Sequence, residues 1–213
     1  DLVNQTTVWQ KKIDNNICIY SIAISSYGQY IVAGHRYNSS AAKVYLFGKD
    51  SSTPIWSYDT GSNRIVKVAI SLDGTTIAAV AMDGNGGHDL YSFDVSSSTP
   101  LWSNSLYDPG QVGLEVSSDG SYIVYHGRVY DNSNQYMVRV YYAWSSTPIF
   151  TATTGSTAGD CCWSARNTVA ISDDADLITV AVRDNVFLYN ISNHIPLWSY
   201  QLPGYYPKGK FFD

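Results

Sequence analysis

Two adjacent cysteines, Cys161 and Cys162, are the residues of this sequence whose spacing points most directly to chemistry. Adjacent cysteines can form a disulfide only in a strained ring that contains a distorted peptide bond, and a strained disulfide is unusually easy to reduce. The pair is therefore a candidate redox disulfide. One ordinary disulfide that leaves a free thiol, and buried, inert thiols, are the alternatives. Cys18 is the only other cysteine, so the chain has no disulfide framework.

Arginine recurs at one position of an internal repeat. When the repeats are aligned on a shared isoleucine, the position five residues further on holds Arg36, Met82, Arg128 and Arg183. The planar guanidinium group suits carboxylates and phosphates, so the three arginines are candidate ligands for an anion. Pairing with nearby aspartates or stacking on tyrosines is the alternative.

The third copy of the repeat carries two charges that the other copies lack. Glu115 replaces an alanine, and Arg139 replaces an aromatic residue. An unpaired charge in a packed sheet is costly, so we expect either a contact between Glu115 and Arg139 or separate polar partners. A third alternative places Glu115 in a central channel as a candidate ligand or acid.

Segment 83–94, DGNGGHDLYSFD, loosely matches a calcium-binding loop, with Asp83, Asn85 and Asp94 near ligand positions. His88 stands where such a loop needs glycine, so turn composition explains the segment better. The four histidines lack the paired spacing of metal ligands, and we expect no metal or other cofactor.

The composition is that of a packed globular protein with a polar, weakly charged surface. Of the 213 residues, 45% are hydrophobic and 15% are charged, and the net charge of −5 disfavours nucleic acid as a partner. No apolar run approaches the roughly 18–20 residues that cross a bilayer. The N-x-[ST] pattern makes Asn4, Asn38 and Asn190 candidate glycosylation sites, so we expect an extracellular or cell-surface location. Because the chain starts at Asp1 without a signal-like segment, we expect a processed chain or an excerpt.

These residues must be positioned by a repeating element. Each copy is marked by a proline and by an aromatic residue two positions later. The prolines are spaced 46, 48 and 48 residues apart: Pro54, Pro100, Pro148 and Pro196. The rings are Trp56, Trp102, Phe150 and Trp198, and Trp9 precedes the first of them by 47 residues. This period is close to that of one four-stranded propeller blade.

Each period contains four predicted strands. An apolar strand such as KVAIS (67–71) is followed by a tight turn such as LDG, a second strand such as TIAAVAM (76–82) and a third such as LYSF (90–93). Proline is tolerated at a sheet edge, so the proline-aromatic stretch is predicted to be the outermost strand. We expect its ring to fill the space between neighbouring blades.

The elements V-A-I-S-x-D-G, V-Y-L-F and P-L-W-S-Y resemble the WD-repeat and pyrroloquinoline-quinone-like propeller repeats, especially forms common in archaeal surface proteins. The resemblance spans nearly the whole chain and implies an all-β propeller of four-stranded antiparallel blades, but it says little about function. In the quinone-dependent dehydrogenases a vicinal disulfide lies against the cofactor, which implies a redox role for Cys161 and Cys162. Those enzymes also need a calcium site and a catalytic aspartate, and neither is evident here.

The chain is predicted to be a single propeller over residues 1–213. Its repeats cover about 7–53, 54–99, 100–147 and 148–195, with a partial repeat at 196–213. Five outer strands accompany only four inner triplets, so we expect about four blades that belong to a larger ring. A closed ring of four blades with an aromatic tail is the alternative.

Two sets of loops alternate along the repeat, and one of them varies strongly in length and composition. Loops on a fixed scaffold commonly carry binding residues, so this variable loop face is the predicted functional face. We expect a non-enzymatic extracellular module that binds a protein or a glycan, or whose copies pack together. A quinoprotein-like redox enzyme and an intracellular WD-repeat scaffold are the alternatives.

Overall fold

A computed structural model of the chain describes residues 6–13, 18–36, 42–62, 64–106, 112–128, 135–156, 169–182 and 185–202. These residues form sixteen β-strands and one short 3₁₀ turn at Ser26–Gly28. They contain no α-helix, and hence no helix that could span a membrane. The prediction of an all-β fold is confirmed.

The first half of the chain folds into two four-stranded antiparallel units. Blade 1 consists of β1 (Cys18–Ile24), β2 (Tyr30–Arg36), β3 (Lys43–Gly48) and β4 (Pro54–Asp59). Blade 2 consists of β5 (Arg64–Ile70), β6 (Thr76–Met82), β7 (His88–Asp94) and β8 (Trp102–Leu106). A bridge between β2 and β5 joins the two blades into one continuous sheet.

The second half repeats the same meander in two separate sheets. Blade 3 consists of β9 (Gly113–Val116), β10 (Tyr122–Arg128), β11 (Gln135–Tyr142) and β12 (Pro148–Ser156). Blade 4 consists of β13 (Val169–Ile171), β14 (Leu177–Val182), β15 (Asn185–Asn190) and β16 (Trp198–Gln201). The proline-aromatic stretch supplies the outermost strand of every blade, as predicted.

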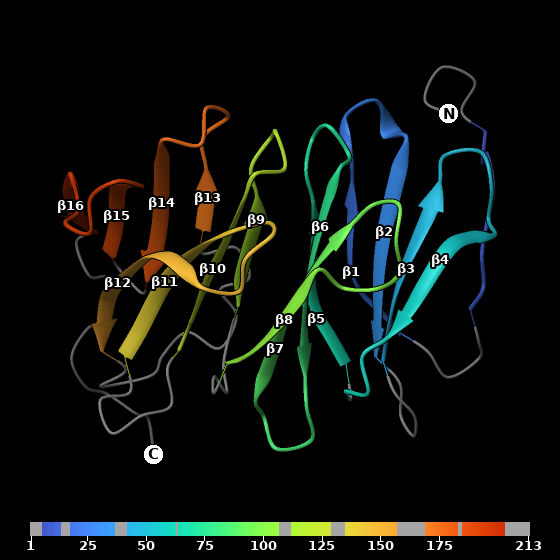
Figure 1. Cartoon of the computed structure of the whole chain (residues 1–213), viewed down its shortest axis with the longest axis horizontal. Coiled ribbons are helices and arrows are strands. Elements are labelled where there is room, and N and C mark those ends of the chain that lie inside the picture. Colours follow the sequence, from blue (N-terminus) through green and yellow to red (C-terminus); the bar gives the residue numbers. More distant parts are fainter. Residues whose placement is uncertain are drawn as a thin grey trace, which may run out of the picture.

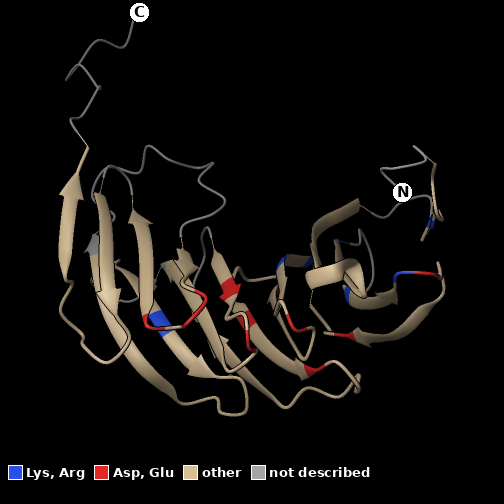
Figure 2. Ribbon diagram, turned by 90° about the horizontal axis from the view of Figure 1, so that it is seen from above, with Lys and Arg blue, Asp and Glu red and all other residues tan. Residues whose placement is uncertain are grey.

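The four blades stand in a row from blade 1 to blade 4 (Figure 1). Seen from above, the row follows an open arc with blades 1 and 4 at its two ends (Figure 2). The described blades therefore do not close a ring among themselves, which agrees with the predicted part of a larger ring and not with a closed ring of four.

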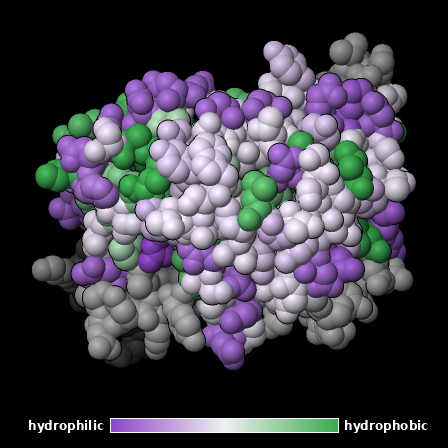
Figure 3. Space-filling view, in the orientation of Figure 1, coloured by the Kyte–Doolittle hydropathy of each residue, from purple (hydrophilic) through white to green (hydrophobic). Residues whose placement is uncertain are grey.

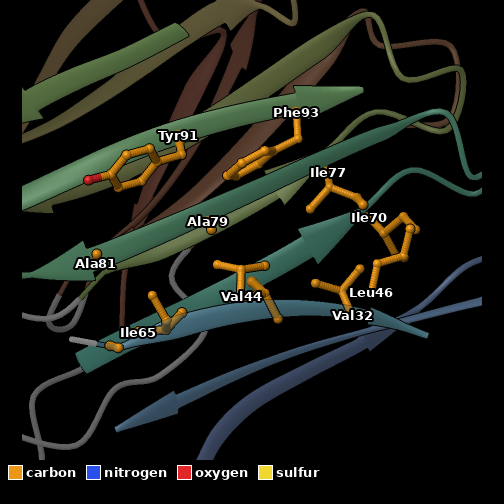
Figure 4. Close-up of a cluster of buried hydrophobic side chains, with 12 residues drawn as sticks. Val32, Val44, Leu46, Ile65, Ile70, Ile77, Ala79, Ala81, Tyr91 and Phe93 are labelled. Carbon is orange, nitrogen blue, oxygen red and sulfur yellow. The ribbon is translucent and has the colours of Figure 1, made fainter. Parts of the chain in front are cut away.

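Apolar cores fill the spaces between consecutive blades. Between blades 1 and 2, Val44 and Leu46 are fully buried against residues such as Ile77 and Phe93 (Figure 4). Two further clusters lie between blades 2 and 3 and between blades 3 and 4. Strand β6 is apolar at successive positions because an inner blade is covered on both faces. Full burial of each such side chain stabilises the fold by about 1.5–3 kcal/mol.

The hairpins between first and second strands share one side-chain arrangement. Ser71 Oγ donates to Asp73 at 2.6 Å and accepts the backbone N–H of Thr76 at 3.0 Å. The Ser117–Asp119 pair of blade 3 repeats this contact at 2.6 Å. Gly74 follows with a φ of +77°, a conformation that glycine adopts without strain. The predicted Asp-Gly turns are confirmed.

The calcium-like segment does not form one loop. Asp83 precedes β7 and Asp94 ends it, so a seven-residue strand rising about 3.3 Å per residue separates the two carboxylates. Asp83 Oδ1 instead accepts the backbone N–H groups of Asn85 and Gly87, at 2.9 Å and 2.7 Å. Turn chemistry therefore accounts for this aspartate.

Candidate functional site

Polar and charged side chains meet where β2, β5, β6 and β7 have their ends on the variable loop face. Arg36 is the cross-strand partner of Arg64, Arg64 of Met82, and Met82 of His88. The pairing continues across the boundary between blades 1 and 2, so neighbours in this row come from different blades. With Tyr20 and Tyr125, which contact the row, these residues are called the Arg64 cluster below.

Arg64 is the centre of the cluster. Its guanidinium carbon lies 5.9 Å from the ring centroid of Tyr20, and its Nη2 donates to the sulfur of Met82 at 2.7 Å. Its Nε is buried and has no hydrogen-bond partner in the described part of the chain. Leaving a buried donor without a partner costs about 1–3 kcal/mol, so the arrangement favours an acceptor that arrives from outside.

His88 is buried beside Arg64. Its Nδ1 lies 3.3 Å from the hydroxyl of Tyr125 in blade 3, and its Nε2 has no partner among the described residues. Burial, helped by the positive charge of Arg64 and opposed by Asp83, lowers the pKa of His88 to about 4. The imidazole is therefore neutral at pH 7 and can donate or accept a hydrogen bond without carrying charge.

Of the three arginines that the repeat alignment selected, only one has a described side chain. Arg36 is exposed at the end of β2. The side chain of Arg128 and the whole of Arg183 lie outside the described residues, so a ring of arginines remains a prediction. Arg64, which the repeat alignment did not select, lies beside Arg36 because β5 follows β2 in the continuous sheet. The sequence feature that could have pointed to Arg64 is its position just before the predicted strand KVAIS.

Glu115 and Arg139 are not partners. Cross-strand pairing places Glu115 beside Val124, whereas Arg139 lies beside Tyr125. Since Val124 and Tyr125 are successive residues of β10, the two charges lie on opposite faces of blade 3. The expected contact is therefore wrong.

Glu115 has a different electrostatic neighbour. Burial raises the pKa of its carboxyl, and the positive charge of Lys67 in β5 opposes that rise. Both residues lie on innermost strands, one in blade 3 and one in blade 2. A role for Glu115 as a ligand remains a prediction.

The remaining candidates are mostly outside the described residues, including Asn4, Asn38, Cys161 and Cys162. Asn190 ends β15, where its Oδ1 accepts the backbone N–H of Ser192 at 2.9 Å. Cys18 is a free, exposed cysteine at the start of β1.

A stack of aromatic rings lies on the opposite face, where the short turns are. Trp144 is 63% exposed and lies nearly parallel to Tyr142, with 5.0 Å between ring centroids. Tyr142 in turn lies 5.4 Å from Tyr122. The sequence analysis did not predict this stack, because it expected the segments before each Ser-Ser-Thr-Pro stretch to be uniform turns. The signal was Trp144 itself, since Asp50 and Ser96 stand there in the other repeats.

The fold is that of a β-propeller built from four-stranded antiparallel blades. No family model and no curated protein matches the chain at the level of sequence. Its structure is similar to a chain in the crystal structure of the mitotic checkpoint complex, with a TM-score of 0.64 and 17% identity over 89% of this chain and 55% of that one. It is similar to the C-terminal WD40 domain of Sif2, with a TM-score of 0.63 and 17% identity over 90% of this chain and 48% of that one.

A third similar structure is the hydrazine synthase of Kuenenia stuttgartiensis, with a TM-score of 0.56 and 14% identity over 80% of this chain and 52% of that one. At these identities the similarity concerns the fold. The chain spans about half the length of each of the three structures.

Proposed function

We propose that this propeller is a protein-interaction module whose variable loop face binds an acidic segment of a partner through the Arg64 cluster. The observation that carries the proposal is the position of Arg64, held over Tyr20 beside Arg36 with its buried Nε unpaired within the described residues. Arginine and tyrosine are the residue types that most often dominate binding energy at protein interfaces. One of the similar chains belongs to the mitotic checkpoint complex, which supports the same class of function.

The chemistry of the cluster favours a carboxylate. A guanidinium group can donate two parallel hydrogen bonds to one carboxylate, and Nε is one of the donors available for that geometry. The adjacent Arg36 adds a second positive charge at the exposed rim. His88 is neutral, so it can offer a further hydrogen bond without placing a second positive charge beside Arg64.

A peptide-display selection tests this proposal. Random peptides are selected on the purified chain, and the affinity of an isolated peptide is measured by fluorescence anisotropy. We expect peptides that contain Asp or Glu, and at least tenfold weaker binding to Arg64→Gln, which corresponds to about 1.4 kcal/mol. Lys49→Gln is the matched control, because Lys49 pairs with Asp50 on the opposite face. Selection of neutral peptides, or unchanged binding to Arg64→Gln, would contradict the proposal.

An extracellular or cell-surface location is proposed together with this function. The candidate glycosylation sites and the weakly charged surface support it. Glycan mass on Asn4, Asn38 or Asn190 of protein isolated from its native source would test it, and the unmodified mass would favour an intracellular scaffold. The redox alternative predicts a bound quinone, which an absorption spectrum of the native protein would reveal.

A glycan is the second candidate partner, and the stack of Tyr122, Tyr142 and Trp144 favours it. Exposed, rigid rings provide apolar contact area at low entropic cost, and Trp144 presents one face to solvent. Tryptophan fluorescence titrated with oligosaccharides should change with the native chain and not with Trp144→Ala. An equal response from both would exclude this stack as the binding surface.

A further inference from the structure

A pocket opens between the first hairpins of blades 1 and 2, on the face that carries the short turns and opposite to the Arg64 cluster. Its volume is about 320 Å³, and Tyr27, Tyr30, Leu72 and Asp73 are among the residues that line it. Ligand sites in proteins commonly have volumes of about 300–1,000 Å³, so the pocket can hold one long side chain of a partner. Two tyrosines, a leucine and a carboxylate therefore share one pocket.

Hydrogen bonds between consecutive hairpins fix the walls of this pocket. The backbone N–H of Ser26 donates to the carbonyl of Leu72 at 2.8 Å, and that of Asp73 donates to the carbonyl of Ser118 in blade 3 at 3.1 Å. The hairpins of blades 1, 2 and 3 are thus tied to one another. The pocket is therefore preformed, and a ligand does not have to order it on binding.

The corresponding place between blades 2 and 3 is closed. There Thr76 Oγ1 donates to the carbonyl of Gly120 at 2.8 Å, and a Cβ added to Gly120 would lie 2.4 Å from Thr75 Oγ1. Blade 1 has Gln29 and Tyr30 at the positions of these two threonines. The pocket therefore depends on residues that blade 2 lacks.

The fold does not explain Tyr27. It occupies the position at which the hairpins of the other three blades have Asp73, Asp119 and Asp174. Its φ is +59°, which costs a residue with a Cβ about 1–2 kcal/mol. Its ring is 94% exposed and makes no hydrogen bond or ring contact with any described residue. The conformation therefore destabilises the turn without a packing gain in the described chain, and strained residues of this kind cluster at binding sites.

Negative charge dominates the short turns of this face. The turns between first and second strands and between third and fourth strands carry Asp50, Asp73, Asp94, Asp119, Asp173, Asp174 and Asp176. Lys49 is the single lysine or arginine in these turns, all of which are described, and it pairs with Asp50 at 2.6 Å. Figure 2 looks onto this face and shows acidic residues on several blades, and Figure 3 shows hydrophilic residues along the same edge. This face therefore attracts a positively charged partner.

Asp73 places one of these charges at the pocket. Ser71 Oγ and the backbone N–H of Thr75 donate to its Oδ1, at 2.6 Å and 3.0 Å. Burial raises the pKa of Asp73, but these hydrogen bonds outweigh burial and hold the pKa below its ordinary value, so the carboxylate is charged at pH 7. Its Oδ2 accepts only the hydroxyl of Thr75 among the described residues, and it can therefore accept another hydrogen bond.

We infer that this pocket binds an arginine side chain of a basic segment in a partner protein. A guanidinium group stacks on tyrosine rings and binds carboxylates, and here Tyr27 and Tyr30 line one pocket with Asp73. Leu72 is 48% exposed and provides an apolar surface for the methylene groups of the same side chain. A lysine lacks the planar group that stacks on a ring, so arginine is the preferred occupant.

This site is separate from the acidic segment proposed for the Arg64 cluster. The two sites lie on opposite faces and take ligands of opposite charge. The failure of either one therefore leaves the other intact.

Fluorescence anisotropy with a labelled hexa-arginine peptide, at an ionic strength of about 0.15 M, tests the inference. We expect saturable binding of one peptide per chain, and roughly tenfold weaker binding to Tyr27→Asn. Asn-Gly is a favoured hairpin turn, so this variant should keep the fold and unfold at a higher temperature than the native chain. Weaker binding together with higher stability would show that Tyr27 serves binding and not folding.

Asp73→Asn tests the carboxylate, and Asp174→Asn is its matched control. Both aspartates accept a serine hydroxyl at the same turn position, but Asp174 lies in blade 4, outside the pocket. We expect roughly fivefold weaker binding to Asp73→Asn and little change with Asp174→Asn, although each variant loses one charge. Thermal unfolding shows whether both variants fold.

The inference is wrong if hexa-arginine shows no saturable binding, or if Tyr27→Asn binds it as tightly as the native chain does. Equal losses from Asp73→Asn and Asp174→Asn would also overturn it, because they would indicate a general attraction to the acidic face. Hexalysine that binds as tightly as hexa-arginine would contradict the assignment of a guanidinium group.

Discussion

Arg36 and Arg64 are direct cross-strand neighbours at the bridge that joins blade 1 to blade 2. Like charges in such positions repel each other, so this pair lowers the stability of the fold. A bound carboxylate would remove that repulsion and satisfy the buried Nε of Arg64. The relationship is therefore the structural reason for assigning an acidic partner to this face.

The contact of Trp56 with blade 2 predicts a graded loss of stability. Trp56→Phe keeps a ring against Phe93 but loses the bond to Val95, and should lower the free energy of unfolding by about 1 kcal/mol. Trp56→Ala also loses the packing and should cost about 3 kcal/mol. Urea denaturation measures both changes. Trp198→Phe is the control and should change stability little, because Trp198 is 49% exposed. Equal losses at both sites would show that the contact with blade 2 does not stabilise the fold.

Ala175 is predicted to strain its turn. Its φ is +59°, at the position where blades 2 and 3 have Gly74 and Gly120. Ala175→Gly should therefore stabilise the protein by about 1 kcal/mol, because the left-handed region is unfavourable for a residue with a Cβ. Thermal unfolding would show the gain.

Gly120→Ala provides the opposite control for this turn. Its φ is +73°, and an added Cβ would come within 2.4 Å of Thr75 Oγ1. This variant should lose more stability than Ala175→Gly gains. Equal and small effects from both substitutions would show that the turn tolerates either residue.

His88 should make stability depend on pH. Its pKa is about 4 in the folded protein and near 6.5 when unfolded, so the unfolded chain binds the extra proton in this window. Stability is full above pH 6.5 and falls as the pH drops toward 4, by about 2 kcal/mol between pH 7 and pH 5.

His88→Gln should remove only the part of the slope that His88 contributes, which is similar in size to the part that His126 contributes. Urea denaturation at pH 7 and pH 5 provides the comparison. His126 retains its own contribution, because burial also lowers its pKa to about 4. The pKa values of Asp73 and Asp119 are lowered, so their effects fall below this window. An unchanged slope in His88→Gln would show that the pKa of His88 is the same in the folded and the unfolded chain.

Glu115 should couple energetically to Lys67 and not to Arg139. Lys67 opposes the burial-induced rise in the pKa of Glu115, whereas Arg139 lies on the other face of blade 3. A double-mutant cycle with Glu115→Gln and Lys67→Met should give a coupling of about 0.5–1 kcal/mol, and the cycle with Arg139→Met should give none. A larger coupling to Arg139 would refute the assignment of faces.

Much of the fold could be predicted because a blade is built from contacts that are local in the sequence. The serine, aspartate and glycine around Gly74 specify a hairpin, and a proline such as Pro54 confines its strand to the edge. The ring two residues later then reaches the next blade, as Trp56 does. The candidate site was harder to predict. Aligning the repeats compares one position of every repeat, so it does not reveal contacts between residues at different positions of the repeat, such as Arg36 and Arg64.

The sequence by itself determined the period, the four strands of each blade and the positions of the rings between blades. The tertiary structure alone decided which polar residues meet: Arg36 with Arg64, Tyr125 with His88, and Glu115 facing the charge of Lys67. The physical reason is that hydrogen-bonded hairpins follow from short-range patterns. Contacts between blades depend instead on how whole twisted sheets stack, and residues far apart in the chain then share one boundary.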